Sequence, residues 1–127
     1  MKEIIIQYTE FGKPFYKNLY YNVSHDADLV IIVYNNKPIG VDIMKKKSIN
    51  IFNLYDCFTL REKQCLTNDN FLSYWCAKEA FLKALGVGLS VEMSSIEYVN
   101  NHIVYEGKEY KVEFIEIPFY VCIFVEI

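Results

Sequence analysis

The alternation of apolar and polar positions in the first third of the chain predicts extended strands separated by turns. Apolar and β-branched residues dominate four segments, at residues 4–8, 19–24, 29–35 and 39–44. The segments between them contain Gly, Pro, Asn and Asp, which favour turns. The last three strand segments therefore predict an antiparallel meander.

The middle of the chain has the pattern of two helices. Thr59 and Glu62 have the spacing of a capping box, which indicates the start of a short helix. A longer helix follows, which Asp69 or Asn70 can cap and Gly86 can end. Its residues include many strong helix formers, and they are apolar almost all around a helical wheel. Such a helix is expected at the centre of the fold.

The last third of the chain again predicts strands. Apolar segments lie at residues 96–99, 102–105, 108–115 and 119–126, with turns between them. The 127 residues contain no repeat, linker or low-complexity segment, so we expect a single domain over residues 1–127. The predicted fold class is α+β, with an antiparallel sheet packed on the long central helix.

Composition and charge exclude several classes of protein. With 53% hydrophobic residues the chain is not disordered, and its formal charge of -3 opposes binding to nucleic acid. The four cysteines lack the spacing of a zinc site and are expected to be free thiols. The start of the sequence has no signal-peptide pattern, and the longest apolar stretch is too short to span a membrane. These features predict a soluble, cytoplasmic protein.

Two carboxylates occupy positions that favour apolar side chains. Glu79 shares its side of the long helix with Leu72 and Trp75, and Asp42 interrupts an apolar strand. A central helix packed on the sheet would bring the two carboxylates close together. Carboxylate oxygens without His or thiolate partners suit a hard cation such as Mg²⁺. The alternative for Glu79 is an ordinary ion pair with Lys83, one helical turn away.

Lys83 and His25 each have a structural and a functional interpretation. Beside a metal site, Lys83 would neutralise negative charge on a transferred phosphate or its leaving group. His25 would hydrogen-bond a phosphate, although a lone histidine at the end of a strand is more often structural. Ser24, His25 and Asp26 do not form a catalytic triad, because consecutive residues of an extended chain point to opposite faces.

Three further features have simpler interpretations. The lysines at positions 45–47 are expected in a solvated loop, with a basic docking surface as the alternative. His102 lies beside a predicted turn and is expected in solvent. The glycines at positions 86 and 88 are typical of a helix end and not of a dinucleotide-binding loop.

Four motifs, taken in order, resemble those of the 4'-phosphopantetheinyl transferases. They are G-K-P at residues 12–14, Y-N-V-S-H at 21–25, G-V-D-I at 40–43 and W-C-A-K-E-A-F-L-K-A-L-G-V-G at 75–88. The combination of W-x-x-K-E-A-x-x-K with an upstream G-V-D-I is specific, whereas G-K-P or S-H alone is not. The strand-rich remainder of the chain resembles the C-terminal segment of the family.

The resemblance implies an enzyme that moves the phosphopantetheine arm of coenzyme A to a serine of an apo acyl or peptidyl carrier protein, as holo-acyl-carrier-protein synthase does. Adenosine 3',5'-bisphosphate would be released, with Mg²⁺ as the cofactor. Asp42 and Glu79 match the metal ligands of the family, and Glu79 would also help to deprotonate the serine. Lys83 matches the catalytic lysine that faces the phosphates. His25 and Lys13 match residues that contact coenzyme A.

The chain departs from the family in two ways. Met44 stands where the larger, surfactin-type members carry a third carboxylate, and a thioether is a poor ligand for a hard cation. The motif order is that of the surfactin type, whose members have two similar halves, so most of the first half is expected to be missing.

Self-association would cover the apolar surface left open, and we therefore expect a homo-oligomer. The alternative to an active transferase is a non-catalytic module of the same fold that binds coenzyme A or a carrier protein.

Overall fold

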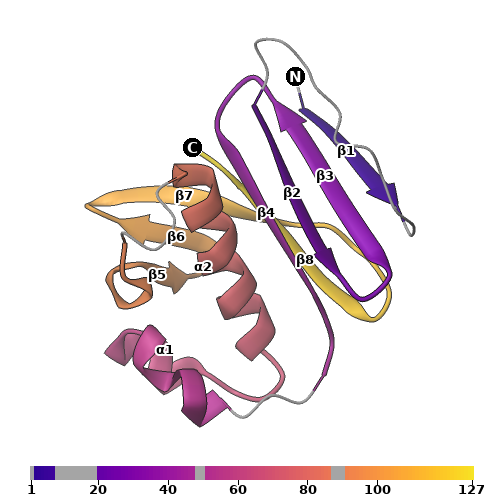
Figure 1. Cartoon of the computed structure of the whole chain (residues 1–127). Coiled ribbons are helices and arrows are strands. Elements are labelled where there is room, and N and C mark those ends of the chain that lie inside the picture. The colour runs from indigo at the N-terminus through magenta and orange to yellow at the C-terminus, as the bar shows by residue number, and fades with distance from the viewer. Residues whose placement is uncertain (1, 8–19, 48–50, 87–90) are drawn as a thin grey trace.

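The computed structural model describes residues 2–7, 20–47, 51–86 and 91–127, whose strands form two antiparallel sheets (Figure 1). The first sheet has the strand order β1-β3-β2, and the second has the order β4-β8-β7-β6-β5. The strands of the first sheet are β1 (Lys2–Gln7), β2 (Tyr20–Asp26) and β3 (Leu29–Asn35). Those of the second sheet are β4 (Ile39–Lys45), β5 (Glu97–Val99), β6 (His102–Tyr105), β7 (Lys108–Phe114) and β8 (Tyr120–Glu126).

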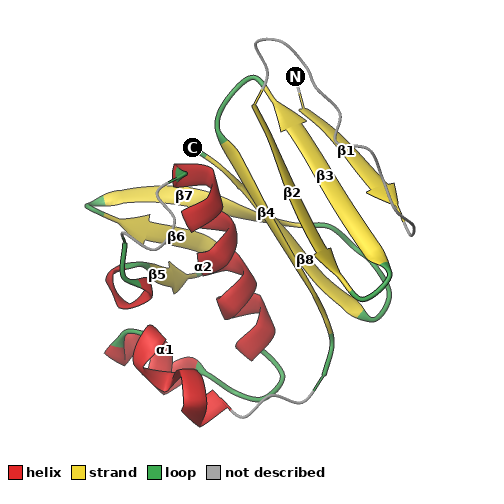
Figure 2. Ribbon diagram, in the orientation of Figure 1, coloured by secondary structure: helices red, strands yellow, loops and turns green. Residues whose placement is uncertain are grey.

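The helices of the described residues lie mainly between β4 and β5 in sequence. They are the 3-10 helix η1 (Ile51–Cys57), the α-helices α1 (Leu60–Cys65) and α2 (Phe71–Leu85), and the 3-10 helix η3 (Met93–Ser95). Figure 2 shows α2, the longest of them, lying against the second sheet. No helix in the described ranges has the length and apolar character needed to cross a membrane. The observed architecture confirms the predicted α+β fold with a long central helix.

Strand β8 is buried on both faces, so the core has two parts. Ile123 and Val125 of β8 pack in one hydrophobic cluster with Ala77 and Phe81 of α2. Phe124, which points to the opposite face, packs in a second cluster with residues of β3 and β4. The second sheet therefore separates α2 from the first sheet near its β4–β8 edge.

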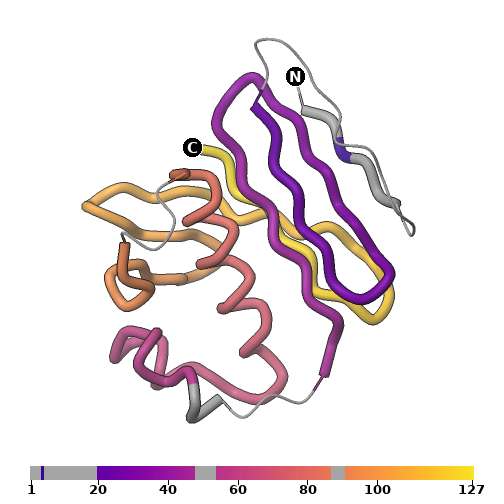
Figure 3. Tube along the Cα trace, viewed as in Figure 1, coloured from indigo at the N-terminus to yellow at the C-terminus, as the bar shows by residue number. Residues whose placement is uncertain are grey.

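The predicted meander is wrong at its last step. Strands β2 and β3 do form a hairpin, and Ala27 takes a positive φ of 51° in its turn. Strand β4, however, pairs with β8, so that Asp42 lies opposite Ile123. Because β1 and β2 already occupy both edges of β3, β4 takes a partner from the C-terminal part of the chain. The path of the chain from β3 into β4, and the position of β4 beside β8, can be followed along the Cα trace in Figure 3.

The predicted helix ends are mostly confirmed. The Thr59 side chain accepts a hydrogen bond from the Glu62 amide, and the Glu62 side chain accepts one from the Thr59 amide, which completes the capping box of α1. Gly86 ends α2 in the left-handed conformation, with φ of 72°. Asn70 stands at the start of α2 without a side-chain cap, because its side chain instead bonds the Thr67 amide and the Cys65 carbonyl.

The contact between β4 and α2 depends on a glycine. A Cβ atom at Gly40 would overlap the backbone carbonyl of Ala80 and would lie 2.5 Å from the backbone nitrogen of Ala84. A side chain at this position would therefore push the strand and the helix apart. Without one, β4 lies directly on α2, and Asp42 is two residues farther along the same strand.

Candidate active site

Asp42 and Glu79 lie on the two elements that meet at this contact. Val41 and Ile43 of β4 are buried against the first sheet, so the alternation of the strand directs Asp42 toward α2. Glu79 lies on α2, one turn before Lys83. The structure thus brings together the three residues that the sequence singled out, from elements far apart in the chain.

The electrostatic environment of the two carboxylates is unfavourable for negative charge. Burial raises the pKa of Asp42 to about 6, from its ordinary value of 3.8. The charge of Lys83 and hydrogen bonds from Cys76 and Ser24 lower the pKa of Asp42, whereas the charge of Glu79 raises it. Burial also raises the pKa of Glu79, and Lys83 opposes that shift. A cation bound between these carboxylates would relieve the cost of ionising both.

Lys83 connects the site to the junction of the two sheets. Its Nζ atom donates hydrogen bonds to the carbonyl oxygens of Val23 on β2 and Val41 on β4, at 2.8 Å and 2.7 Å. Burial lowers the pKa of Lys83, and the charges of Asp42 and Glu79 raise it in part. The ammonium group therefore holds two strands in place while its charge acts on both carboxylates. In the described part of the chain, Lys83 makes these backbone hydrogen bonds and no direct ion pair with Glu79.

Side chains of β2 hold the backbone of β4. Asn22 Oδ1, Ser24 Oγ and Asp26 Oδ2 accept hydrogen bonds from alternate backbone amides of β4, at 2.9 Å, 3.1 Å and 2.6 Å. The donors are the amides of Val41, Ile43 and Lys45. We call this row of contacts the β2–β4 seam. Because the amides are spaced two residues apart, the seam fixes the position of the strand that carries Asp42.

The other residues predicted for the site are placed less closely around it. His25 is exposed on β2, next to Ser24, and Ser24 and Asp26 both face β4, so the structure agrees that these three residues form no triad. Lys13 lies outside the described residues. The lysines at positions 45–47 are exposed. His102 begins β6, where its Nδ1 atom lies 2.9 Å from the carbonyl oxygen of Asn100.

Sequence reasoning missed the buried pair formed by Lys78 and Glu62. Lys78 Nζ lies 2.6 Å from Glu62 Oε1, both side chains are fully buried, and Lys78 also donates to the carbonyl oxygen of Cys57 at 2.8 Å. The second carboxylate oxygen of Glu62 accepts the backbone amide of Tyr98 at 2.9 Å. The pair therefore ties α1, α2 and β5 together. The signal available in the sequence was a lysine on a helix that is otherwise apolar almost all round.

Two buried thiols lie close enough to Asp42 to be affected by its charge. The four cysteines are free, as the sequence predicts, and Cys76 and Cys122 are buried. Burial, followed by the nearby charge of Asp42, raises the pKa of Cys76, and the same two causes raise the pKa of Cys122 to about 12. Both side chains are thus neutral thiols, which leaves the oxygen atoms of Asp42 and Glu79 as the donors for a hard cation.

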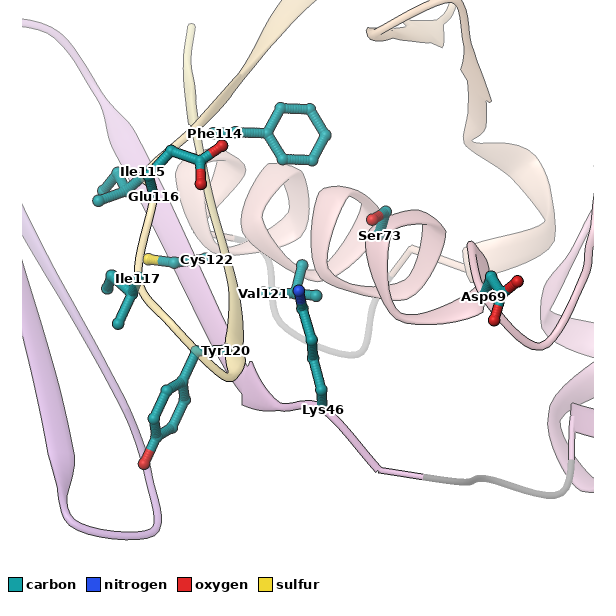
Figure 4. A pocket seen from close by; sticks show the side chains of 10 residues that line it. All are labelled: Lys46, Asp69, Ser73, Phe114, Ile115, Glu116, Ile117, Tyr120, Val121 and Cys122. Carbon is teal, nitrogen blue, oxygen red and sulfur yellow. The ribbon is translucent and has the colours of Figure 1, made fainter.

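A cavity of about 210 Å³ borders this region (Figure 4). It lies between the N-terminal half of α2 and the β7–β8 connection. Lys46, Asp69, Ser73 and Glu116 contribute polar groups to its wall, and the remaining residues are Phe114, Ile115, Ile117, Tyr120, Val121 and Cys122. Asp42 and Glu79 are not among its lining residues, so the cavity does not contain these carboxylates.

The donor set at the β4–α2 contact fits Mg²⁺ and does not fit a metal held entirely by protein ligands. Within residues 2–7, 20–47, 51–86 and 91–127, no group of three or more His, Cys, Asp and Glu side chains is arranged to hold a metal ion. Mg²⁺ is commonly bound by one or two carboxylates, with water and substrate phosphates as its other ligands. Asp42 and Glu79 supply that number of carboxylates.

Comparison with known proteins decides the family. The model of the 4'-phosphopantetheinyl transferase superfamily matches residues 38–118, which is more than half of the chain. The chain belongs to this superfamily. The matched segment of this superfamily member contains Asp42, Glu79 and Lys83.

Curated members of the superfamily are similar over most of the chain. The 4'-phosphopantetheinyl transferase ffp of Bacillus subtilis is 36% identical over 96 residues, which cover 68% of this chain and 43% of the relative. The L-aminoadipate-semialdehyde dehydrogenase-phosphopantetheinyl transferase of Xenopus laevis is 31% identical over 133 residues, which cover 85% of this chain and 44% of the relative. The chain thus spans less than half the length of these relatives.

Proposed function

We propose that this protein is a 4'-phosphopantetheinyl transferase. It transfers the phosphopantetheine arm of coenzyme A to a serine of an apo acyl or peptidyl carrier protein and releases adenosine 3',5'-bisphosphate. The observation that supports this most strongly is the meeting of Asp42, Glu79 and Lys83 at the β4–α2 contact in a member of the superfamily. The holo-acyl-carrier-protein synthase type of reaction is part of the proposal.

The residues of the site have separate tasks in this reaction. Asp42 and Glu79 would hold Mg²⁺, which supplies positive charge to the pyrophosphate of coenzyme A. The serine oxygen forms a bond to the β-phosphorus, the bond from that phosphorus to the bridging oxygen breaks, and its electron pair leaves with adenosine 3',5'-bisphosphate. Glu79 would accept the serine proton, directly or through water, as the general base. Lys83 places positive charge where the leaving group develops negative charge.

Substrate contacts extend the proposal beyond the carboxylates. His25 is exposed on β2, two residues after Val23, which Lys83 contacts, and we assign it to a phosphate of coenzyme A. We assign Lys13 to the adenosine end of coenzyme A by its motif alone. The exposed lysines at positions 45–47 suit an acidic carrier protein, because opposite charges favour docking. A cytoplasmic location fits the four free cysteines.

Met44 is the observation that favours the alternative function. Its side chain packs with the hydrophobic residues around α2, and β4 therefore offers one carboxylate to a metal. A weakened metal site would leave a module that binds coenzyme A or a carrier protein without transfer. Two measurements separate the transferase from the non-catalytic module. Calorimetry measures binding of coenzyme A with and without Mg²⁺, and intact-mass spectrometry measures transfer to a carrier protein.

We also propose that the protein works as a homo-oligomer. Tyr20, Phe114 and Phe119 are large hydrophobic residues that are 53%, 47% and 75% exposed. A second copy packed against these side chains would remove them from water. Sedimentation at increasing concentration is expected to show association. A monomer at every concentration would contradict this part of the proposal.

Intact-mass spectrometry tests the proposed transfer. Apo carrier proteins are incubated with the protein, coenzyme A and Mg²⁺, and a parallel sample contains a chelator. The proposal predicts that the carrier gains the mass of phosphopantetheine and that the chelator prevents the gain. No gain with several carriers, together with no binding of coenzyme A, would overturn the transferase and would favour a non-catalytic module that binds a carrier protein.

A further inference from the structure

We propose that Ser24 is a positioning residue for Asp42, which it holds in the orientation that binds Mg²⁺. This inference rests on the proposed function, because it assumes that Asp42 is a metal ligand. Ser24 belongs to the β2–β4 seam and lies outside the segment that the superfamily model matches.

Ser24 contacts Asp42 and the peptide bond that follows it. Ser24 Oγ accepts the amide of Ile43 at 3.1 Å and donates to Asp42 Oδ1 at 3.3 Å. A hydroxyl group has one hydrogen and two lone pairs, so the bond from the Ile43 amide uses a lone pair and leaves the hydrogen for the carboxylate. The side chain is 7% exposed, so little water is present to compete for either bond. Ser24 thereby contacts both the backbone beside Asp42 and its carboxylate, which also accepts a hydrogen bond from Cys76 on α2.

The neighbouring contacts of the seam show what is particular to Ser24. Asn22 holds the amide of Val41 and Asp26 holds the amide of Lys45, in the same way that Ser24 holds Ile43. Both of these contacts go to the backbone of β4. Ser24 differs from Asn22 and Asp26 because, within the described seam, it also donates a hydrogen bond to the Asp42 side chain. Asn22 and Asp26 are therefore matched controls, which share the structural role of Ser24 and lack its contact with the carboxylate.

Orientation matters at this site because it has few protein ligands. Two carboxylates leave most of the coordination of Mg²⁺ to water and substrate, and Mg²⁺ demands nearly ideal octahedral geometry. A carboxylate that rotates freely would lose affinity for the ion. Residues that orient metal ligands through hydrogen bonds typically contribute about 10- to 100-fold to metal affinity.

The test measures binding of Mg²⁺ without turnover. Mg²⁺ is titrated into the intact protein with coenzyme A present and no carrier protein, and the shift of the unfolding temperature gives the half-saturating concentration. The variants are Ser24→Ala, Ser24→Thr, Asn22→Ala and Asp26→Ala, with Asp42→Asn as the reference for a lost ligand. The unfolding temperature without Mg²⁺ reports the structural effect of each substitution separately.

The proposal predicts different behaviour for the two kinds of seam residue. Ser24→Ala raises the half-saturating Mg²⁺ concentration by about 10-fold, and Ser24→Thr, which keeps the hydroxyl, restores it. Asn22→Ala and Asp26→Ala lower the unfolding temperature without Mg²⁺ and change the half-saturating concentration much less than Ser24→Ala does. Equal effects of Ser24→Ala and Asn22→Ala on that concentration would overturn the positioning role. An Asp42→Asn variant that binds Mg²⁺ normally would instead overturn the metal assignment on which the inference rests.

Discussion

Gly40 lies against Ala80 at the point where strand β4 meets helix α2, with no room for a side chain between them. The carbonyl oxygen of Ala80 and the backbone nitrogen of Ala84 would both be crowded by a Cβ atom. These atoms belong to the helix backbone and cannot rotate away as a flexible side chain would. The spacing of the two elements, and with it the separation of Asp42 and Glu79, is therefore set by this glycine.

Gly40→Ala is expected to destabilise the protein and to weaken the metal site together. Forcing a methyl group into a packed backbone contact costs about 3 kcal/mol or more of unfolding free energy. Denaturant unfolding measures the loss, and a Mg²⁺ titration measures the effect on the carboxylates. A variant with wild-type stability would show that β4 and α2 are not in close contact.

The buried pair of Lys78 and Glu62 predicts a strongly non-additive double-mutant cycle. Lys78→Met or Glu62→Gln leaves one buried polar partner without its counterpart, which costs about 3 to 5 kcal/mol when a buried ion pair is broken. The double variant removes both charges, so it loses less stability than the sum of the single variants. Unfolding free energies of the four proteins measure the coupling. Additive losses would mean that the two side chains do not interact.

The raised pKa of Asp42 predicts that the metal-free protein loses stability as the pH rises. The folded-state pKa of about 6 lies above the ordinary 3.8, so the folded protein binds the proton more tightly than the unfolded chain does. The resulting stabilisation is present below pH 3.8 and is lost as the pH rises through 6. Relative to Asp42→Asn, wild type should lose about 2 to 3 kcal/mol between pH 4 and pH 7.5 in the presence of a chelator. A constant difference between the two proteins would contradict the burial of this carboxylate.

His25→Ala is expected to weaken binding of coenzyme A more than catalysis. The side chain is exposed, so its removal should leave the unfolding temperature unchanged. The KM for coenzyme A should rise while kcat changes little, because the proposed contact is with a phosphate that does not react. Steady-state kinetics with varied coenzyme A provide the measurement. If the KM is that of wild type, His25 does not belong to the site.

Local patterns in the sequence predicted the helices and the candidate carboxylates. The capping box of Thr59 and Glu62 forms as expected, since it needs only residues three positions apart. Asp42 and Glu79 stood out because each carries a charge at a position that favours apolar side chains. The central helix then brought them together, as packing on the sheet requires.

The features that the sequence did not reveal depend on contacts between distant residues. The apolar pattern of β4 is the same whether its neighbour is β3 or β8, so it does not specify the partner. Backbone amides of β4 donate hydrogen bonds to side chains of β2, where a sheet would have the backbone of a paired strand. The local sequence contains no pattern that predicts these contacts. The partner of Lys78 likewise lies on another helix, and the spacing within α2 does not point to it.

The proposed catalytic centre is tested most directly by comparing the transfer rate of Glu79→Gln with that of Glu109→Gln. Both variants lose one carboxylate, but Glu79 lies beside Asp42 and Lys83 at the β4–α2 contact, whereas Glu109 is exposed on β7. Loss of a general base costs about 10²- to 10⁴-fold in rate, and loss of a metal ligand adds to that. We expect at least a 100-fold loss for Glu79→Gln and a wild-type rate for Glu109→Gln, measured as phosphopantetheine transferred to an apo carrier protein. Equal rates for the two variants would contradict the assignment of Asp42, Glu79 and Lys83 as the catalytic centre.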